Sequence, residues 1–180
     1  MPRIPYLAKD LAEPSDLVAA IRARRGGSLL DLDRMLLHSP PFAKGWNALL
    51  GGVRNELALP AKLRELAICA VARLNEAEYE FRQHAPEFLK AGGTAAQAAA
   101  LGAPGTSAAW GDDGALFDAA ERAVLRLTTE MTRQVKVGDA AFSAVRPVLA
   151  DDRQVVELVG VIATYNMVSR FLVALGIEPE

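Results

Sequence analysis

Two acidic residues and one histidine form the pattern in this sequence that can do chemistry. Glu80 lies four residues before His84, so the two share one face if the segment is a helix. A carboxylate in that place can accept a hydrogen bond from one imidazole nitrogen and fix the tautomer, which leaves the other nitrogen free to take or give a proton. The spacing therefore indicates acid–base chemistry centred on His84.

Glu65 is a second acid that can join this pair. Glu65 lies ten residues before Asn75, and His84 lies nine residues after Asn75. Two helices paired antiparallel about a turn near Asn75 would therefore bring Glu65 opposite His84. An apolar run follows Glu65 directly and favours its burial, and buried carboxylates near a histidine are candidates for functional sites. The alternative is a solvated helix face, on which the Glu80–His84 pair is worth only about 0.2–0.5 kcal/mol.

Other reactive residue types give weaker patterns. Glu80, His84 and Glu87 line one side of a helix, but the spacing is Glu-x-x-x-His rather than the Glu-x-x-His of di-iron carboxylate sites, so we expect no metal. His38 is expected at a helix C-terminus, with a role in a site as the alternative. The one cysteine, Cys69, lies in an apolar run, where a thiol is expected to be inert.

The elements that must position these residues are helices, because apolar residues recur at helical spacing and no strand alternation extends over a useful length. The expected helices cover 15–25, 28–38, 41–56, 60–74, 76–91, a short segment capped by Thr94 and Gln97, 114–134, 139–149 and a last helix that ends at Leu175. Residues 102–113 are expected to form a loop that exposes Trp110. The sequence predicts an all-α fold of eight or nine helices in a single domain over residues 1–180.

Composition and charge narrow the class of protein. The net charge is −2, so no basic surface indicates nucleic-acid binding. The N-terminal residues lack the apolar stretch of a signal peptide. The apolar segment 155–175 is long enough to cross a bilayer, but it contains Glu157, Asn166 and Arg170, and charges near a membrane centre are costly. We therefore expect a cytoplasmic protein that binds neither nucleic acid nor membrane.

The central segment contains Arg64-Glu65-Leu66 at an expected helix start, Tyr79-Glu80-Phe81-Arg82-Gln83-His84 in the next expected helix, and Gly92 eight residues later. This pattern resembles the core of the carboxymuconolactone decarboxylase / alkylhydroperoxidase superfamily. The resemblance covers about residues 35–180, with the family core at about 35–105. It implies an alkylhydroperoxidase-like helical bundle and a homo-oligomer, whether dimer, trimer or hexamer.

One departure from the family pattern decides which branch fits. The alkylhydroperoxidase branch has a Cys-x-x-Cys motif seven and four residues before the histidine, where this chain has Ala77 and Glu80. Without either sulfur, thiol-based peroxide reduction has no nucleophile.

The branch without these cysteines implies a cofactor-independent enzyme. His84 is then the general acid/base, Glu80 its orienting partner and Glu65 a second proton carrier, in decarboxylase, lactonase or isomerase chemistry on a small organic acid. No cofactor is expected. A peroxidase-like antioxidant protein and a non-catalytic oligomer that binds a small ligand remain alternatives.

Aromatic and amide side chains are the candidates for contact with a small-molecule substrate. They are Trp46, Tyr79, Tyr165 and Asn166. Each is expected either to line the substrate pocket or to pack in the protein core.

Overall fold

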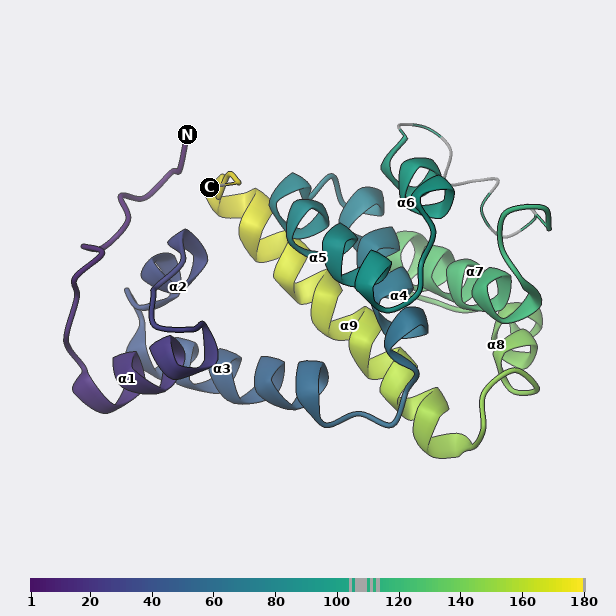
Figure 1. Cartoon of the computed structure of the whole chain (residues 1–180), viewed down its shortest axis with the longest axis horizontal. Coiled ribbons are helices and arrows are strands. Elements are labelled where there is room, and N and C mark those ends of the chain that lie inside the picture. The colour runs from purple at the N-terminus through teal and green to yellow at the C-terminus, as the bar shows by residue number, and fades with distance from the viewer. Residues whose placement is uncertain (104, 106–109, 111, 113, 180) are drawn as a thin grey trace. The chain divides into compact units, whose positions relative to one another are not determined.

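A computed structural model describes residues 1–103, 105, 110, 112 and 114–179. Within these residues the chain is helical, with nine α-helices and no strand, as the sequence predicts (Figure 1). The helices are α1 (Ser15–Arg24), α2 (Asp31–Leu36), α3 (Pro40–Asn55), α4 (Ala61–Leu74), α5 (Glu78–Lys90), α6 (Ala95–Gly102), α7 (Ala119–Gln134), α8 (Asp139–Val145) and α9 (Asp152–Leu175).

The helices group into two compact units. The terminal unit comprises residues 1–57 and 174–180, and the central unit comprises residues 58–173. Helices α1 to α3 belong to the terminal unit, and α4 to α8 with nearly all of α9 belong to the central unit. The expected single domain over residues 1–180 stays a prediction.

The terminal unit joins the two ends of the chain. The backbone N–H of Arg3 donates to the carbonyl of Leu175 at 2.9 Å. Asp33 is buried at the start of α2 and accepts hydrogen bonds from the backbone N–H of Leu30 and from Nε of Arg25, both at 3.1 Å. This carboxylate ties the helix start to the end of α1 and holds part of the unit's core in place.

The central unit is built around α4, whose residues from Leu66 to Ala72 are completely buried. This run is rich in alanine, which favours helix formation and lets neighbouring helices approach closely. Helices α5 and α7 pack directly against α4. Burial on all sides explains why α4 has an apolar sequence with few polar positions.

Helix α9 is long and apolar enough, by length and composition, to cross a membrane. Ten of its 24 side chains are nevertheless buried inside the protein, among them the polar residues Thr164, Asn166 and Ser169. One such helix is therefore weak evidence for a membrane span. The cytoplasmic location stays a prediction.

Two details differ from the sequence-based expectation. The helix expected over 114–134 begins only at Ala119, because Asp118 and Glu121 form a reciprocal capping box that fixes its start. Trp110 was expected to be exposed, but it is 3% exposed and its indole N–H donates to the carbonyl of Ala100 at 3.2 Å. The prediction for Trp110 is therefore wrong. Residues 104, 106–109, 111 and 113 of the expected loop lie outside the described residues.

Candidate active site

A helical hairpin positions the candidate site. Helix α4 ends at Leu74 and α5 begins at Glu78, and the backbone N–H of Ala77 donates to the carbonyl of Ala72 at 2.8 Å to close the turn. Glu76 takes a left-handed conformation, with φ of 56°, which reverses the chain within a few residues. The turn sets the register of the two helices, and that register decides which side chains face each other.

The hairpin brings Glu65 and His84 into direct contact, as predicted from their distances to the turn. His84 Nδ1 and Glu65 Oε2 are 2.7 Å apart, and both residues are buried, at 6% and 5% exposure. The guanidinium of Arg64 donates from Nε to the other carboxylate oxygen, Oε1, at 3.2 Å. One carboxylate thus holds an imidazole at one oxygen and a guanidinium at the other.

The protonation of this pair follows from the environment of Glu65. Burial raises the pKa of the carboxyl group, but the hydrogen bond and charge of His84, with a contribution from Arg64, outweigh burial and lower the pKa below its ordinary value. An ionised carboxylate only accepts hydrogen bonds, so Nδ1 of His84 must be the donor and carry a proton. In the neutral imidazole, Nε2 then holds the lone pair and can act as a base.

Glu80 lies in the same buried region, at 2% exposure. The hydroxyl of Ser169, on α9, is 3.0 and 3.1 Å from its two carboxylate oxygens and donates to the carboxylate. The charges of Glu80 and Glu65 both act on the Cys69 thiol, so the two carboxylates flank the same part of α4. The alternative of a solvated helix face is therefore wrong for Glu65, Glu80 and His84.

Of the predicted substrate residues, Tyr165 lies against the histidine. Its ring meets the ring of His84 edge to face, with centroids 5.0 Å apart and an interplanar angle of 86°. Tyr165 is completely buried on α9, so it forms a rigid apolar wall beside the imidazole. Tyr79 is also buried, one residue before Glu80 on α5.

The other two predicted substrate residues have different surroundings. The amide of Asn166 donates to Thr132 Oγ1 and to the carbonyl of Ile162, both at 3.0 Å, and its oxygen accepts from Asn75 at 3.1 Å. These hydrogen bonds join α9 to α7 and to the hairpin turn, so Asn166 stabilises the packing of these elements. Trp46 belongs to the terminal unit, where its ring meets Phe42 edge to face at 5.8 Å.

Cys69 is close to the candidate site but is not available for chemistry. The side chain is completely buried, and burial raises the pKa of its thiol, with the charges of Glu65 and Glu80 raising it further. The thiolate is the reactive form of cysteine, and here it is strongly disfavoured. Attack on a peroxide by Cys69 therefore has no support in the structure.

Residues that could bind a metal do not gather in the part of the chain that the structure describes. There, no group of three or more His, Cys, Asp or Glu side chains is arranged to hold an ion. His38, just past the end of α2, has Nε2 2.8 Å from the carbonyl of Pro5 and holds the N-terminal segment. A role of His38 in the chemistry has no support in this contact.

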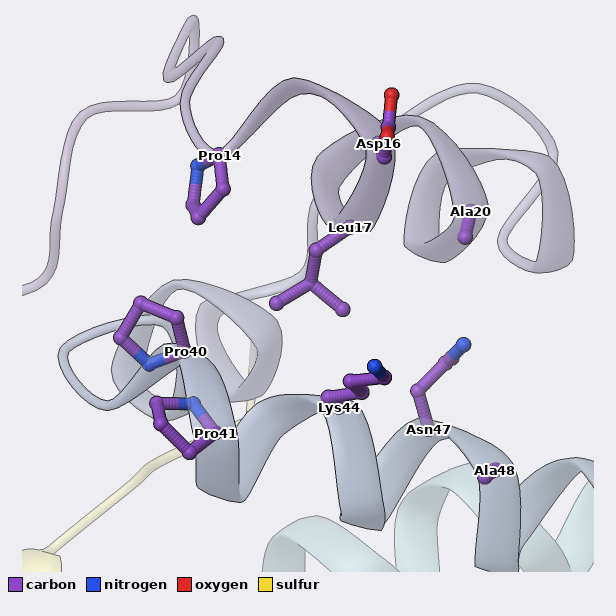
Figure 2. Close-up of a pocket in the computed structure, with 9 residues that line it drawn as sticks. All are labelled: Pro14, Asp16, Leu17, Ala20, Pro40, Pro41, Lys44, Asn47 and Ala48. Atoms are coloured by element: carbon purple, nitrogen blue, oxygen red, sulfur yellow. The ribbon is translucent and has the colours of Figure 1, made fainter.

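The terminal unit contains a groove between α1 and α3 (Figure 2). It has a volume of about 690 Å³ and is lined mainly by apolar side chains, with Lys44 and Asn47 on the α3 side. None of the predicted site residues lines it. The groove is therefore a separate feature from the cluster around His84.

Ser169 was not among the site residues predicted from the sequence. The sequence nevertheless contained a signal, because Ser169 lies four residues after Tyr165 and three after Asn166 in a largely apolar helix. Polar side chains at this spacing share one face and need buried partners. That signal shows that a polar partner must exist, but it does not identify Glu80 as the partner.

Comparison with known proteins identifies the family. The model of the carboxymuconolactone decarboxylase family matches residues 40–130. This chain belongs to the carboxymuconolactone decarboxylase family. The matched region contains Arg64, Glu65, Glu80 and His84, so all four side chains lie within the family domain. No curated protein matches the chain significantly.

Solved structures confirm the fold of this family member. A peroxidase-related protein from Silicibacter sp. TM1040 has a TM-score of 0.75 at 18% identity, covering 99% of this chain and 90% of that one. A peroxidase-related protein with an alkylhydroperoxidase AhpD core, from Ralstonia eutropha JMP134, has a TM-score of 0.80 at 17% identity, covering 99% and 92%. A cysteine-to-alanine variant of the debrominase Bmp8, in complex with 2,3,4-tribromopyrrole, has a TM-score of 0.76 at 14% identity, covering 100% and 94%. At these identities the likeness establishes the alkylhydroperoxidase-like fold and no particular activity.

Proposed function

We propose that this member of the carboxymuconolactone decarboxylase family is a cofactor-independent acid/base enzyme acting on a small organic acid, of the decarboxylase, lactonase or isomerase type. The observation that supports the proposal is the buried contact of 2.7 Å between His84 Nδ1 and Glu65 Oε2. A buried imidazole with a fixed tautomer and an ionised partner is the arrangement that general acid–base catalysis uses.

In this proposal Glu65 orients the histidine and Nε2 handles the proton. When Nε2 removes a proton from the substrate, the resulting imidazolium is stabilised by the negative charge of Glu65, and it can then return the proton at another atom. In a decarboxylation the imidazolium acts first as an acid. The bond to the leaving carboxylate breaks, CO2 departs, and the electron pair left on carbon takes the proton from Nε2.

Glu80 and Ser169 form the second part of the proposed site. From the sequence, Glu80 was expected to orient the histidine, but Glu65 is the carboxylate bonded to Nδ1. Glu80, fixed by the Ser169 hydroxyl, is therefore proposed as the second proton carrier. A small-molecule substrate, a homo-oligomeric state and a cytoplasmic location are also part of this proposal.

The surroundings of Cys69 give the peroxidase-like hypothesis less support than the acid–base hypothesis. Structural neighbours carry peroxidase-related names, but the one cysteine of this chain is completely buried and the pKa of its thiol is raised. Peroxide reduction by a thiol needs an accessible thiolate. We therefore favour acid–base chemistry over thiol chemistry for this chain.

The test of the proposal is the loss of His84. We expect His84→Ala to lower kcat about 10²- to 10⁴-fold, because general acid–base help of this kind contributes that much. Turnover would be measured on a panel of small γ-lactone and β-keto acids that includes carboxymuconolactone, the compound for which the family is named. Far-UV circular dichroism would confirm that the helices are retained.

The chain offers a matched control, because His38 is its only other histidine. His38→Ala should leave kcat within about twofold of the original, since His38 is exposed and bonds to the carbonyl of Pro5. Turnover that survives His84→Ala in a folded protein would contradict the proposal.

A further inference from the structure

Arg64 has hydrogen-bonding capacity that the Glu65–His84 pair does not use. Its Nε donates to Glu65, while within the described residues the two Nη nitrogens make no hydrogen bond. The side chain is 17% exposed, so the guanidinium lies at the border between the buried pair and solvent. A guanidinium presents five N–H donors in a planar fork that matches a carboxylate.

The other basic residues of α4 are committed elsewhere. Lys62 pairs with the buried Glu121 at 2.6 Å, and Arg73 pairs with Glu78 at 2.8 Å while stacking over the ring of Phe81. Arg64 is the one basic side chain of this helix that contacts the candidate site through Glu65. Its Nη nitrogens make no hydrogen bond to any residue that the structure describes. Its Nη donors are therefore available to an incoming anion.

The position of Arg64 relative to His84 is set by the carboxylate between them. Arg64 and His84 bond to the two oxygens of one side chain, so the guanidinium and the imidazole are separated by the width of a carboxylate group. A small molecule held by the Nη groups would therefore lie beside the Glu65–His84 pair. This is the placement that an acid/base group needs.

The charges of the cluster limit the kind of anion that fits. With His84 protonated, Arg64, His84, Glu65 and Glu80 carry two positive and two negative charges, so a single added negative charge is tolerated. A polyanion would bring further negative charge beside the buried carboxylates of Glu65 and Glu80. The site therefore suits one carboxylate on an otherwise apolar skeleton, next to the apolar wall of Tyr165.

We propose that Arg64 binds the single carboxylate of the substrate, by hydrogen bonds from Nη1 and Nη2, and that the substrate class is small organic monocarboxylates. Because the reaction retains this anchored carboxylate, the proposal selects the lactonase and isomerase types of the proposed function over decarboxylation. This inference rests on the proposed function. Arg64 is then the specificity-determining residue, while His84 handles the proton.

The test compares an acid with its neutral analogue, levulinate with levulinamide, by isothermal titration calorimetry on the full chain at pH 7. Charge-assisted hydrogen bonds to a carboxylate predict about 10- to 100-fold tighter binding of levulinate. Arg64→Met should remove this preference, so that both ligands bind alike. A purely structural role of Arg64 would weaken both ligands equally and leave the ratio unchanged, which would overturn the proposal.

Two further variants make the result specific. Arg82→Met removes the same charge from an exposed side chain of α5 that pairs with Glu78, and it should keep the full preference. His84→Ala should also keep it, because the anchor is Arg64. A preference lost in His84→Ala, equal binding of both ligands by the unaltered chain, or no measurable binding of levulinate would each overturn the anchor. None of these results decides the acid–base proposal, which depends on the turnover of His84→Ala.

Discussion

Glu65 links the chemistry of the site to the stability of the protein. Its carboxyl group is buried, which raises the pKa, but His84 and then Arg64 lower it below the ordinary value of 4.5. The folded chain therefore holds this carboxyl ionised at pH values where the unfolded chain begins to protonate it. The resulting stabilisation is complete above about pH 4.5 and is lost as the pH falls through the folded-state pKa.

Replacing Glu65 by glutamine should remove that pH-dependent stabilisation. We expect Glu65→Gln to lower the free energy of unfolding at pH 7 by about 1.5–3 kcal/mol, the usual contribution of a hydrogen bond to a charged group. It should also flatten the fall of stability below pH 4.5. Urea unfolding between pH 7 and pH 3.5 measures both effects, with Glu87→Gln on the exposed face of α5 as the control. An acid slope as steep as that of the original chain would show that Glu65 is not an ionised partner.

The contact between Glu65 and His84 could be predicted from the sequence, because a helical hairpin relates residues at similar distances from its turn. The contacts that α9 adds could not. Tyr165 and Ser169 reach His84 and Glu80 across more than 80 residues of chain, and no spacing rule connects them. Their positions depend on how α9 packs, which is a property of the whole core.

At the scale of helices, local signals decide where each element begins. Thr94 was predicted to cap a short helix, and α6 begins directly after it. The Thr94 Oγ1 accepts from the N–H of Gln97 at 3.1 Å, and the Gln97 side chain accepts from the N–H of Thr94 at 3.0 Å. The similar box of Asp118 and Glu121 was overlooked because Leu116 fits the apolar pattern of the following helix. Apolar spacing therefore marked the interior of α7 but not its first residue.

The cap of α6 gives a prediction about stability. Thr94→Ala removes the side-chain acceptor and leaves the N–H of Gln97 without its partner, so the free energy of unfolding should fall by about 1 kcal/mol. Thr94→Ser keeps a hydroxyl in the same place and should lose far less. Chemical denaturation of the two variants beside the original chain measures the difference. Equal losses for alanine and serine would indicate that the methyl group of Thr94, not its hydroxyl, stabilises the helix.

At the scale of the whole molecule, the sequence predicted the helical architecture and the family because both depend on patterns within the chain. Apolar periodicity gave the helices, and the segment from Arg64 to Gly92 gave the family, whose match covers residues 40–130. The expected family core of about 35–105 ends before the end of the family match, because the last motif residue of the core is Gly92. The match itself extends into α7. The division into two compact units depends on contacts that no local pattern encodes.

If residues 1–180 form a single domain, we expect one cooperative unfolding transition. Two variants, one in each compact unit, can test this expectation. Thr94→Ala weakens the central unit, while Asp33→Ala weakens the terminal unit by leaving Arg25 and the N–H of Leu30 without their buried acceptor. If the chain unfolds as one domain, differential scanning calorimetry will show a single peak, and either variant will move that whole peak to lower temperature. The calorimetric and van't Hoff enthalpies will then agree. Two peaks, each shifted by only one of the variants, would show instead that the unit bearing His84 and Glu65 unfolds independently of the terminal helices.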